Sequence, residues 1–180
     1  MPGAYRAYDM AMPTLHENQP QHTEVNAVSE RLRRESGSRQ GLDFLRAIIS
    51  GDLPESPLLQ ALGVHTVQAD EGIVRLETVP QSQQFNTIGT GHGGFLSTLL
   101  DTALGFSVES LSPAGTTWTT TDLHVRFRRP MTVDSGVVSA VGRVEHYGRS
   151  TAIAAGEVRD GSGHILATAT ASFFALRHQE

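Results

Sequence analysis

The residues best suited to chemistry lie in one segment, positions 86–101, with the sequence NTIGTGHGGFLSTLLD. Within it, His92, Gly93 and Gly94 stand where a polar loop enters a helical pattern. The first N–H groups of a helix lack partners within the helix and carry partial positive charge. A glycine there lets a carbonyl oxygen approach these donors closely. The pattern therefore predicts an oxyanion hole of the kind that acyl transfer requires.

Asp101 is the second candidate for chemistry. It is the only charged residue between positions 92 and 109 when histidine is neutral. An ionised carboxylate in so apolar a helix is costly unless it has a partner or faces a polar pocket. Ser97, Asp101 and Gly105 follow at four-residue intervals, so small neighbours leave space beside the carboxylate. We predict that Asp101 is the catalytic carboxylate. The alternative is that Asp101 has a structural role, as a capping or paired residue at a dimer interface.

The spacing of these two features has a consequence for assembly. Gly93 and Asp101 are eight residues apart, which is about 12 Å along a helix axis. A reacting carbonyl must lie about 3 Å from both its oxyanion donor and its nucleophile or base. One helix can hardly offer both groups to one substrate. If both residues act, they come from two chains, and the sequence predicts an obligate dimer with shared active sites.

The apolar pattern predicts an α+β fold in which an antiparallel β-sheet wraps around one long central helix at 93–110. That helix is apolar nearly all round, which is typical of a buried helix. In the strand that follows, Leu123 and Val125 alternate with charged residues, and Thr119 shares their parity and should face the helix. Strands are expected at residues 64–69, 73–79, 117–129, 136–147, 150–159 and 164–176.

The chain divides into three parts on this pattern. Residues 1–38 are polar and read as a tail, partly disordered or with one short helix. Residues 39–55 hold an amphipathic helix packed on the domain, and residues 56–180 form the domain that carries the chemistry. With 180 residues, the chain is long enough for one domain with a real core.

Composition excludes several classes of function. The net charge is −5, which gives no general attraction for nucleic acid or an anionic membrane. The absence of cysteine rules out disulfides, thiolate metal sites and a cysteine nucleophile. We find no metal-ligand spacing among the histidines, no signal peptide and no membrane span, so we expect a cytoplasmic protein without a metal. The G-x-G-x-x-G match at 89–94 follows a polar loop rather than a strand, which argues against a dinucleotide site.

The segment resembles the PaaI-like group of hot-dog-fold thioesterases, named for phenylacetate degradation. That group has an Asn, an H-G-G six residues later, and a helix Asp nine residues after the His. Asn86, His92 and Asp101 match this pattern, and the runs at 119–130 and 160–163 also resemble the family. The resemblance covers about residues 55–177 and implies the hot-dog fold, homodimers and often homotetramers, and acyl-coenzyme A substrates.

The resemblance also implies roles for single residues. Asp101 would be the nucleophile or general base, and the Gly93 N–H the oxyanion donor. Asn86 and His92 would line the thioester site, and Thr119 would position water. No cofactor is implied, since coenzyme A (CoA) enters as part of the substrate.

Basic residues offer candidates for binding the three phosphate groups of CoA. Arg128 and Arg129 belong to a cluster at a strand end, and His146 and Arg149 lie near a predicted turn. Gly94 completes the predicted substrate contacts at the helix start. A solvated face is the alternative explanation for the basic cluster.

Two other functions remain open. A hot-dog hydratase or dehydratase would use a His and an acid in a different spacing. A non-catalytic acyl-CoA-binding hot-dog protein would be expected to lack the helix acid, which is present here as Asp101. We therefore predict an acyl-CoA thioesterase.

Overall fold

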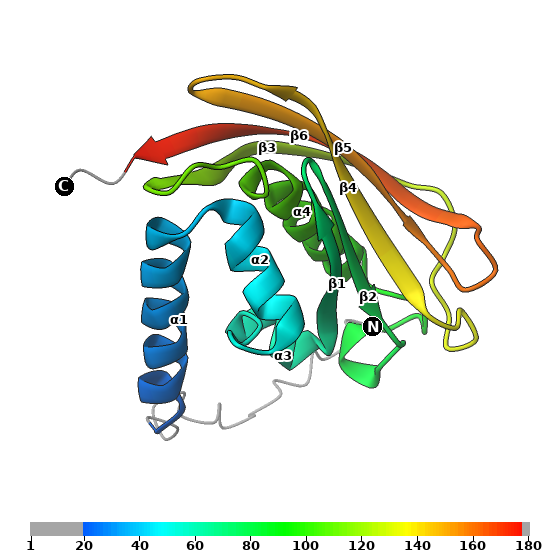
Figure 1. Cartoon of the computed structure of the whole chain (residues 1–180). Coiled ribbons are helices and arrows are strands. Elements are labelled where there is room, and N and C mark those ends of the chain that lie inside the picture. The colour runs from blue at the N-terminus through cyan, green and yellow to red at the C-terminus, as the bar shows by residue number, and fades with distance from the viewer. Residues whose placement is uncertain (1–19, 178–180) are drawn as a thin grey trace, which may run out of the picture.

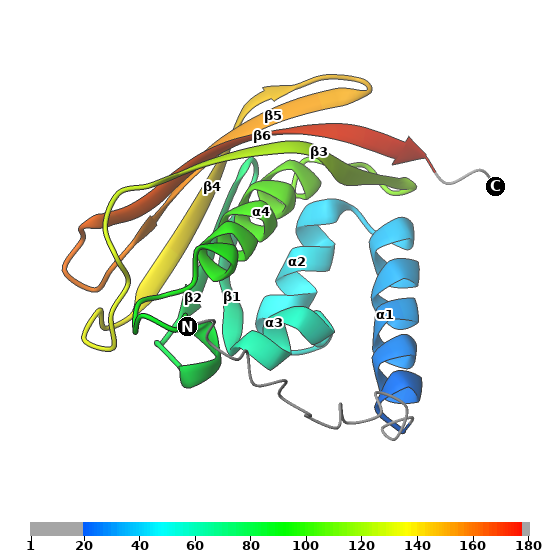
Figure 2. The ribbon, with the colours of Figure 1, turned by 180° about the vertical axis from the view of Figure 1, so that it is seen from behind.

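The fold is a single antiparallel sheet that arches over one central helix (Figures 1 and 2). The computed structural model describes residues 20–177. Its helices are α1 (Pro20–Ser38), α2 (Gly41–Ser50), α3 (Pro57–Leu62) and α4 (Gly93–Glu109), with a 3-10 turn η1 at Ser82–Gln84. Its strands are β1 (Val64–Asp70), β2 (Ile73–Thr78), β3 (Thr116–Phe127), β4 (Val138–Tyr147), β5 (Thr151–Arg159) and β6 (Ile165–Arg177). The strand order is β1-β2-β4-β5-β6-β3, which confirms the predicted hot-dog fold.

Helix α4 forms the centre of the core. Its buried side chains face the concave side of the sheet: Phe95, Leu96, Leu99, Leu100, Ala103, Leu104 and Val108. Gly142 on β4 lets the helix approach, because a Cβ atom there would collide with the carbonyl of Ala103. This close packing fixes the helix against the sheet and therefore fixes the direction in which its polar face points.

The N-terminal helices pack on the domain. Helix α2 coincides with the predicted amphipathic helix, whereas α1 is longer than the short helix expected in the polar tail. The corner between them is pinned to the end of α4: the Gly41 N–H donates to the Ser112 carbonyl at 2.9 Å, and the Gly115 N–H donates to the Gly37 carbonyl at 2.9 Å. Leu32 of α1 packs against the core. The sequence of α1 contains few apolar residues, because only one face of this helix packs against the rest of the domain. Residues 1–19 of the predicted tail lie outside the described residues.

The loop before α4 is fixed by a buried glutamine. Gln84 is fully buried, and its side-chain amide donates to the Leu62 carbonyl at 2.8 Å and to the Thr78 hydroxyl at 3.1 Å. Its side-chain oxygen accepts from the Gln81 N–H at 3.0 Å, and its backbone carbonyl accepts from the His92 N–H at 2.8 Å. A satisfied buried amide of this kind specifies one backbone path, so the start of α4 is held in place.

A β-bulge in β3 changes which residues face the helix. Thr120 pairs with Phe173 and Asp122 with Ser172, so Thr121 is the extra residue. An extra residue inverts the alternation of side chains on one side of the bulge. The prediction that Thr119 faces the helix is therefore wrong, since Thr120 points to the helix side with Leu123. Thr119 is exposed.

Candidate active site

The first residue of α4 presents a free backbone donor. His92 is the N-cap residue, and its Nδ1 accepts a hydrogen bond from the Gly94 N–H at 2.9 Å. A Cβ atom at position 94 would lie 2.9 Å from that nitrogen, so the cap needs glycine there. The Gly93 N–H has no hydrogen-bond partner among residues 20–177. Gly93 therefore keeps its predicted donor available, while the donor of Gly94, a predicted substrate contact, is already used by His92.

Asn86 uses most of its side-chain amide for hydrogen bonds within its own loop. Its Oδ1 accepts from the N–H groups of Ile88 and Thr90, both at 3.1 Å, and its Nδ2 donates to the Thr90 hydroxyl at 2.9 Å. An asparagine amide has two donor hydrogens, so one remains for a ligand. The arrangement is that of a loop stabiliser, and a direct catalytic role for Asn86 stays a prediction.

Asp101 is held by a hydroxyl from β3. The Thr120 Oγ1 donates to Asp101 Oδ1 at 2.8 Å. Asp101 is half-buried on α4, and the bulge in β3 is what brings Thr120 to it. The run of threonines at 119–121 hid this choice in the sequence, because alternation alone selects Thr119. With one carboxylate oxygen so occupied, the other is left for a reacting group.

Two of the predicted basic residues lie beside Gly93. A cavity of about 380 Å³, here called the Gly93 cavity, is lined by Thr90, Gly91, Gly93, Leu96, Phe127, Arg128, Arg129 and Pro130. The backbone N–H groups of Arg128 and Arg129 both donate to the Leu166 carbonyl, at 2.7 and 3.2 Å. Their backbone is thus fixed while both residues are exposed. The structure therefore groups two predicted phosphate-binding residues with the predicted oxyanion donor.

The other two predicted basic residues lie elsewhere in the chain. His146 is the last residue but one of β4, and Arg149 follows in the β4–β5 turn. Next to His146, Tyr147 packs against Trp118 with ring centroids 5.2 Å apart, and the Trp118 Nε1 donates to Ser112 just beyond the C-terminal end of α4. His146 and Arg149 are therefore near the C-terminal end of α4, while Arg128 and Arg129 are near its N-terminal end.

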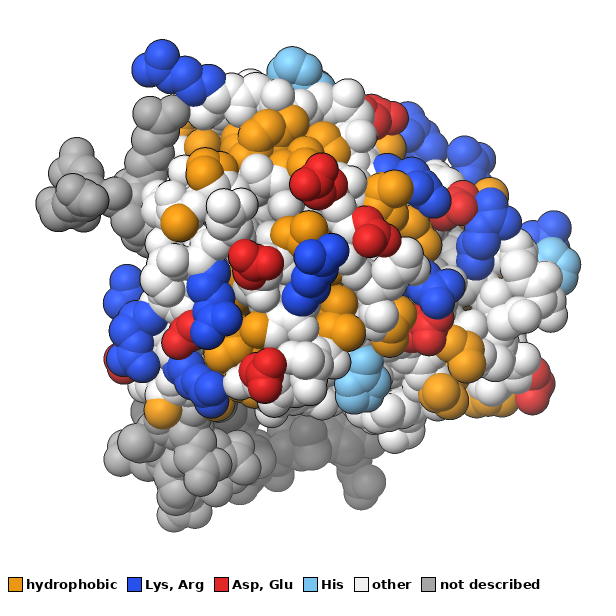
Figure 3. Space-filling model, viewed as in Figure 1, with side chains coloured by type: hydrophobic (Ala, Val, Ile, Leu, Met, Phe, Trp, Pro, Cys, Tyr) orange, Lys and Arg blue, Asp and Glu red, His pale blue; other side chains and the backbone are white. Residues whose placement is uncertain are grey.

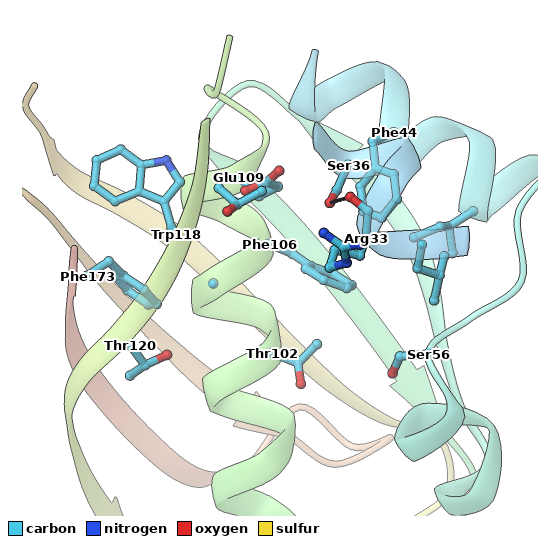
Figure 4. Close-up of a pocket in the computed structure, with 14 residues that line it drawn as sticks. Arg33, Ser36, Phe44, Ser56, Thr102, Phe106, Glu109, Trp118, Thr120 and Phe173 are labelled. Atoms are coloured by element: carbon cyan, nitrogen blue, oxygen red, sulfur yellow. Dashed lines mark hydrogen bonds between the residues drawn. The ribbon is translucent and has the colours of Figure 1, made fainter. Parts of the chain in front are cut away.

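A second cavity lies between the N-terminal helices, α4 and β3. This cavity of about 360 Å³, here called the Glu109 cavity, has apolar walls made by Leu32, Phe44, Ile48, Phe106, Trp118 and Phe173 (Figure 4). Thr120 lines it, so it reaches the hydroxyl that holds Asp101. The sequence signal for this cavity is the spacing of Glu109, which stands eight residues after Asp101 on the same stripe of the helix.

Glu109 is the unusual residue of this cavity. It is only 8% exposed, and its Oε1 is buried without a hydrogen-bond partner among residues 20–177. Burial raises the pKa of its carboxyl from 4.5 to about 7. Buried polar atoms without partners are rare in folded proteins, and each calls for an explanation.

Basic side chains gather over α1, whose sequence includes Arg31, Arg33 and Arg34 (Figure 3). Residues 20–177 hold no group of three or more His, Asp or Glu side chains that could bind a metal ion. Within the same residues, no helix is long and apolar enough to cross a membrane.

An antiparallel sheet around an apolar helix, with a half-buried aspartate and a free N–H donor on that helix, defines a hot-dog protein. The sequence profile of the thioesterase superfamily matches residues 88–167. A protein of Halobacterium salinarum named as a putative esterase is 34% identical over 108 residues, which are 57% of this chain and 71% of the relative. The chain belongs to the thioesterase superfamily.

Solved structures agree with this assignment. Phenylacetic acid degradation protein PaaI of Thermus thermophilus, as a point mutant, matches with a TM-score of 0.60 and 25% identity, covering 66% of this chain and 98% of that one. A hypothetical thioesterase protein of Streptococcus pneumoniae, solved with coenzyme A, matches with a TM-score of 0.59 and 25% identity, covering 65% and 91%. The resemblance to the PaaI-like group is thereby confirmed.

Proposed function

We propose that this protein hydrolyses acyl-CoA thioesters with Asp101 as its catalytic carboxylate. The observation that carries the proposal is the 2.8 Å bond from Thr120 to Asp101 beside an apolar cavity, in a chain of the thioesterase superfamily. A half-buried carboxylate with one oxygen fixed and one free is well placed to act on a carbonyl or on water. The similarity to a thioesterase protein solved with coenzyme A supports CoA as the leaving group.

The chemistry follows from the groups at hand. The thioester carbonyl oxygen accepts a hydrogen bond from the Gly93 N–H, which stabilises the negative charge that develops on it. As general base, Asp101 takes a proton from water while the water oxygen bonds to the carbonyl carbon. As nucleophile, Asp101 forms a mixed anhydride that water then hydrolyses. In either case the C–S bond breaks, the CoA thiolate leaves and takes a proton, and the free acid is released. No cofactor is needed beyond the CoA of the substrate.

The site needs two chains on this proposal. Strand β3 is an edge of the sheet, with β6 as its one neighbour, and an unpaired edge is a natural place for a second copy to bind. A two-fold dimer across β3 sets the two α4 helices in opposite directions. The Gly93 end of one helix then faces the Asp101 region of the other. Pairing of such dimers into a tetramer remains an expectation from the family.

The same dimer would unite the separated basic residues. With the two chains reversed, the His146 and Arg149 end of one chain lies at the Arg128 and Arg129 end of the other. Arginine guanidinium groups bind phosphate in a bidentate manner, which suits the phosphates of CoA. The Gly93 cavity already carries two of them beside the proposed oxyanion donor.

The experiment that tests the function compares wild type with Asp101→Asn on a panel of short, long and aromatic acyl-CoAs, following thiol release. We expect kcat/KM to fall by at least about 10²-fold, because the group that acts on carbonyl or water is lost. Asp70→Asn, an exposed aspartate at the end of β1, is the matched control and should retain full activity. Near-normal turnover by Asp101→Asn would refute the assignment. If wild type binds CoA but turns over nothing, the protein is a binding protein; with no CoA binding, the whole proposal fails.

A further inference from the structure

The Glu109 cavity holds a polar group that the proposed chemistry does not use. Glu109 is more than nine-tenths buried, and its Oε1 has no hydrogen-bond partner among residues 20–177. Leaving a buried acceptor unsatisfied costs free energy comparable to a lost hydrogen bond. Replacing the glutamate with an apolar residue would remove that cost, so its presence points to a ligand group that pairs with it.

The position of Glu109 relates it to Asp101. Asp101, Gly105 and Glu109 follow at four-residue intervals and lie along one stripe of α4, about 12 Å from first to last. Gly105 has no side chain and lines the cavity between the two carboxyl groups. A group bound at Asp101 can therefore extend along the helix to Glu109 past Gly105, with Thr102 and Phe106 of α4 beside it.

The walls decide what kind of chain fits. They combine apolar and aromatic side chains with five serine and threonine side chains, and the cavity volume of about 360 Å³ is within the range of small-molecule sites. Figure 4 shows Glu109 between Trp118 on β3 and the residues Ser36 and Phe44 of the N-terminal helices. An acyl chain with methylene groups along its length and one polar group at its far end matches this order of surfaces.

The charges near Glu109 restrict the chemical identity of this polar group. Arg33 of α1 is the other ionisable residue that lines the cavity, and it is exposed. An ammonium end group would be attracted by Glu109 and repelled by Arg33, and a carboxylate would meet the reverse. A hydroxyl can donate to the Glu109 carboxyl and accept from Arg33 at once.

We propose that the Glu109 cavity receives the far end of the acyl group and that Glu109 selects medium-length acyl chains carrying a terminal hydroxyl. The inference rests on the proposed acyl-CoA function for its reaction, but the binding preference can be measured without turnover. Glu109 is on this proposal a specificity-determining residue that touches the substrate and not the reacting atoms. The α1 and α2 helices, which form one wall of the cavity, are thereby part of the substrate site.

The test uses the full chain and three CoA thioesters: decanoyl-CoA, omega-hydroxydecanoyl-CoA and the omega-carboxy analogue. Binding is measured by calorimetry on Asp101→Asn, and kcat/KM on wild type. We expect the hydroxylated chain to bind and react roughly 10- to 100-fold better than the plain chain, the range for a hydrogen bond to a charged group. Equal or better performance by the plain or the carboxy chain overturns the inference.

Variants assign the preference to its residue. Glu109→Met keeps the length of the side chain without its polar atoms and should abolish the preference for the hydroxyl, measured as the ratio of kcat/KM for omega-hydroxydecanoyl-CoA to that for decanoyl-CoA. Glu71→Met, in the exposed β1–β2 turn, is the control and should keep the preference. An unchanged preference in Glu109→Met contradicts the proposal. If Glu109→Met does not fold, the wild-type comparison still decides. Loss of all hydrolysis with the binding preference intact would count against the proposed function alone.

Discussion

The two halves of α4 differ in how they are made ready for chemistry. At its start, His92 caps the helix, Gly94 uses its donor on that cap, and Gly93 is left with a free N–H. In its second half, Asp101 and Glu109 depend on β3 and on the N-terminal helices for their surroundings. The first half is therefore set by neighbours in sequence, and the second by residues far along the chain.

This difference between the two halves of α4 indicates which positions tolerate substitution. A local cap acts through backbone geometry, so it responds to a change in backbone chemistry and little to side-chain size. A site assembled from β3, α1 and α4 acts through side-chain contacts, so each of its members can be altered while the helix remains. Four substitutions test this difference between the two halves of α4. They are given in order of decreasing expected effect.

Gly93→Pro removes the free donor and leaves the helix start intact. Proline is well tolerated at the first position of a helix, and His92 before it is already extended, with φ −65° and ψ 132°. We expect kcat/KM to fall by about 10²–10³-fold, the value of one oxyanion-hole donor. Gly93→Ala is the control, because it adds a Cβ atom, whose nearest contact is the tip of the exposed Phe127 ring at 3.0 Å, but keeps the N–H. Equal losses in both variants would show that space and not the donor matters.

The same variant tests whether sites are shared between chains. Mixing Gly93→Pro with Asp101→Asn, after unfolding and refolding together, gives mixed dimers with one intact site when the two residues come from different chains. Recovery to about one quarter of wild-type activity is then expected from random pairing. If both groups act within one chain, the mixture stays inactive.

Glu109→Gln tests how much the burial of this second carboxyl group costs in stability. The folded state raises the pKa of Glu109 from 4.5 to about 7, so it holds the proton more tightly than the unfolded chain. Wild-type stability is therefore lost as pH rises from 4.5 to about 7, by about 3 kcal/mol in total. Glutamine does not titrate, so the variant should gain on wild type by that amount between acid and neutral pH. Urea unfolding of both proteins across this pH range measures it, and a pH-independent difference would contradict the burial of an ionisable Glu109.

Thr120→Val removes the hydroxyl that holds Asp101. A hydrogen bond to a charged group contributes about 1.5–3 kcal/mol, so kcat/KM should fall roughly 10- to 100-fold. Thr119→Val is the matched control, because Thr119 is exposed on the other face of β3 and should leave activity unchanged. Thr120→Ser should recover most of the loss by restoring the hydroxyl. A larger loss from Thr119→Val than from Thr120→Val would support the simple alternation of β3.

Gly105→Ala has the smallest expected effect and acts on two quantities in opposite directions. The new Cβ atom meets only the Phe173 ring, at an ordinary 3.6 Å, so helix propensity should raise stability by up to about 1 kcal/mol. The same methyl group stands on the cavity floor between Asp101 and Glu109 and should slow long acyl-CoAs more than acetyl-CoA. Thermal unfolding and a chain-length series measure the two effects. An equal change in rate for all chain lengths would show that the acyl chain does not pass Gly105.

Much of the fold followed from the sequence because its signals are periodic. The apolar surface of 93–110 and the alternation in the later strands predicted the central helix and the antiparallel sheet, and the strand order confirms them. A short helix was allowed in the N-terminal segment, but its full length was hidden because α1 is polar. A single residue such as Leu32 can anchor it once α2 and β3 provide a surface. Asn86 matched the family pattern, yet its amide is mostly used within its own loop.

The capped start of α4 and the aspartate at its centre can be read from the sequence, since helix caps, glycines and apolar periodicity act between residues close along the chain. Only the tertiary structure decided that Thr120 rather than Thr119 reaches Asp101, because a β-bulge depends on pairing with β6. It also decided that Glu109 is buried without a partner, since its walls come from α1, α2 and β3. Such burial is a property of surfaces brought together from distant segments, and no local pattern encodes it.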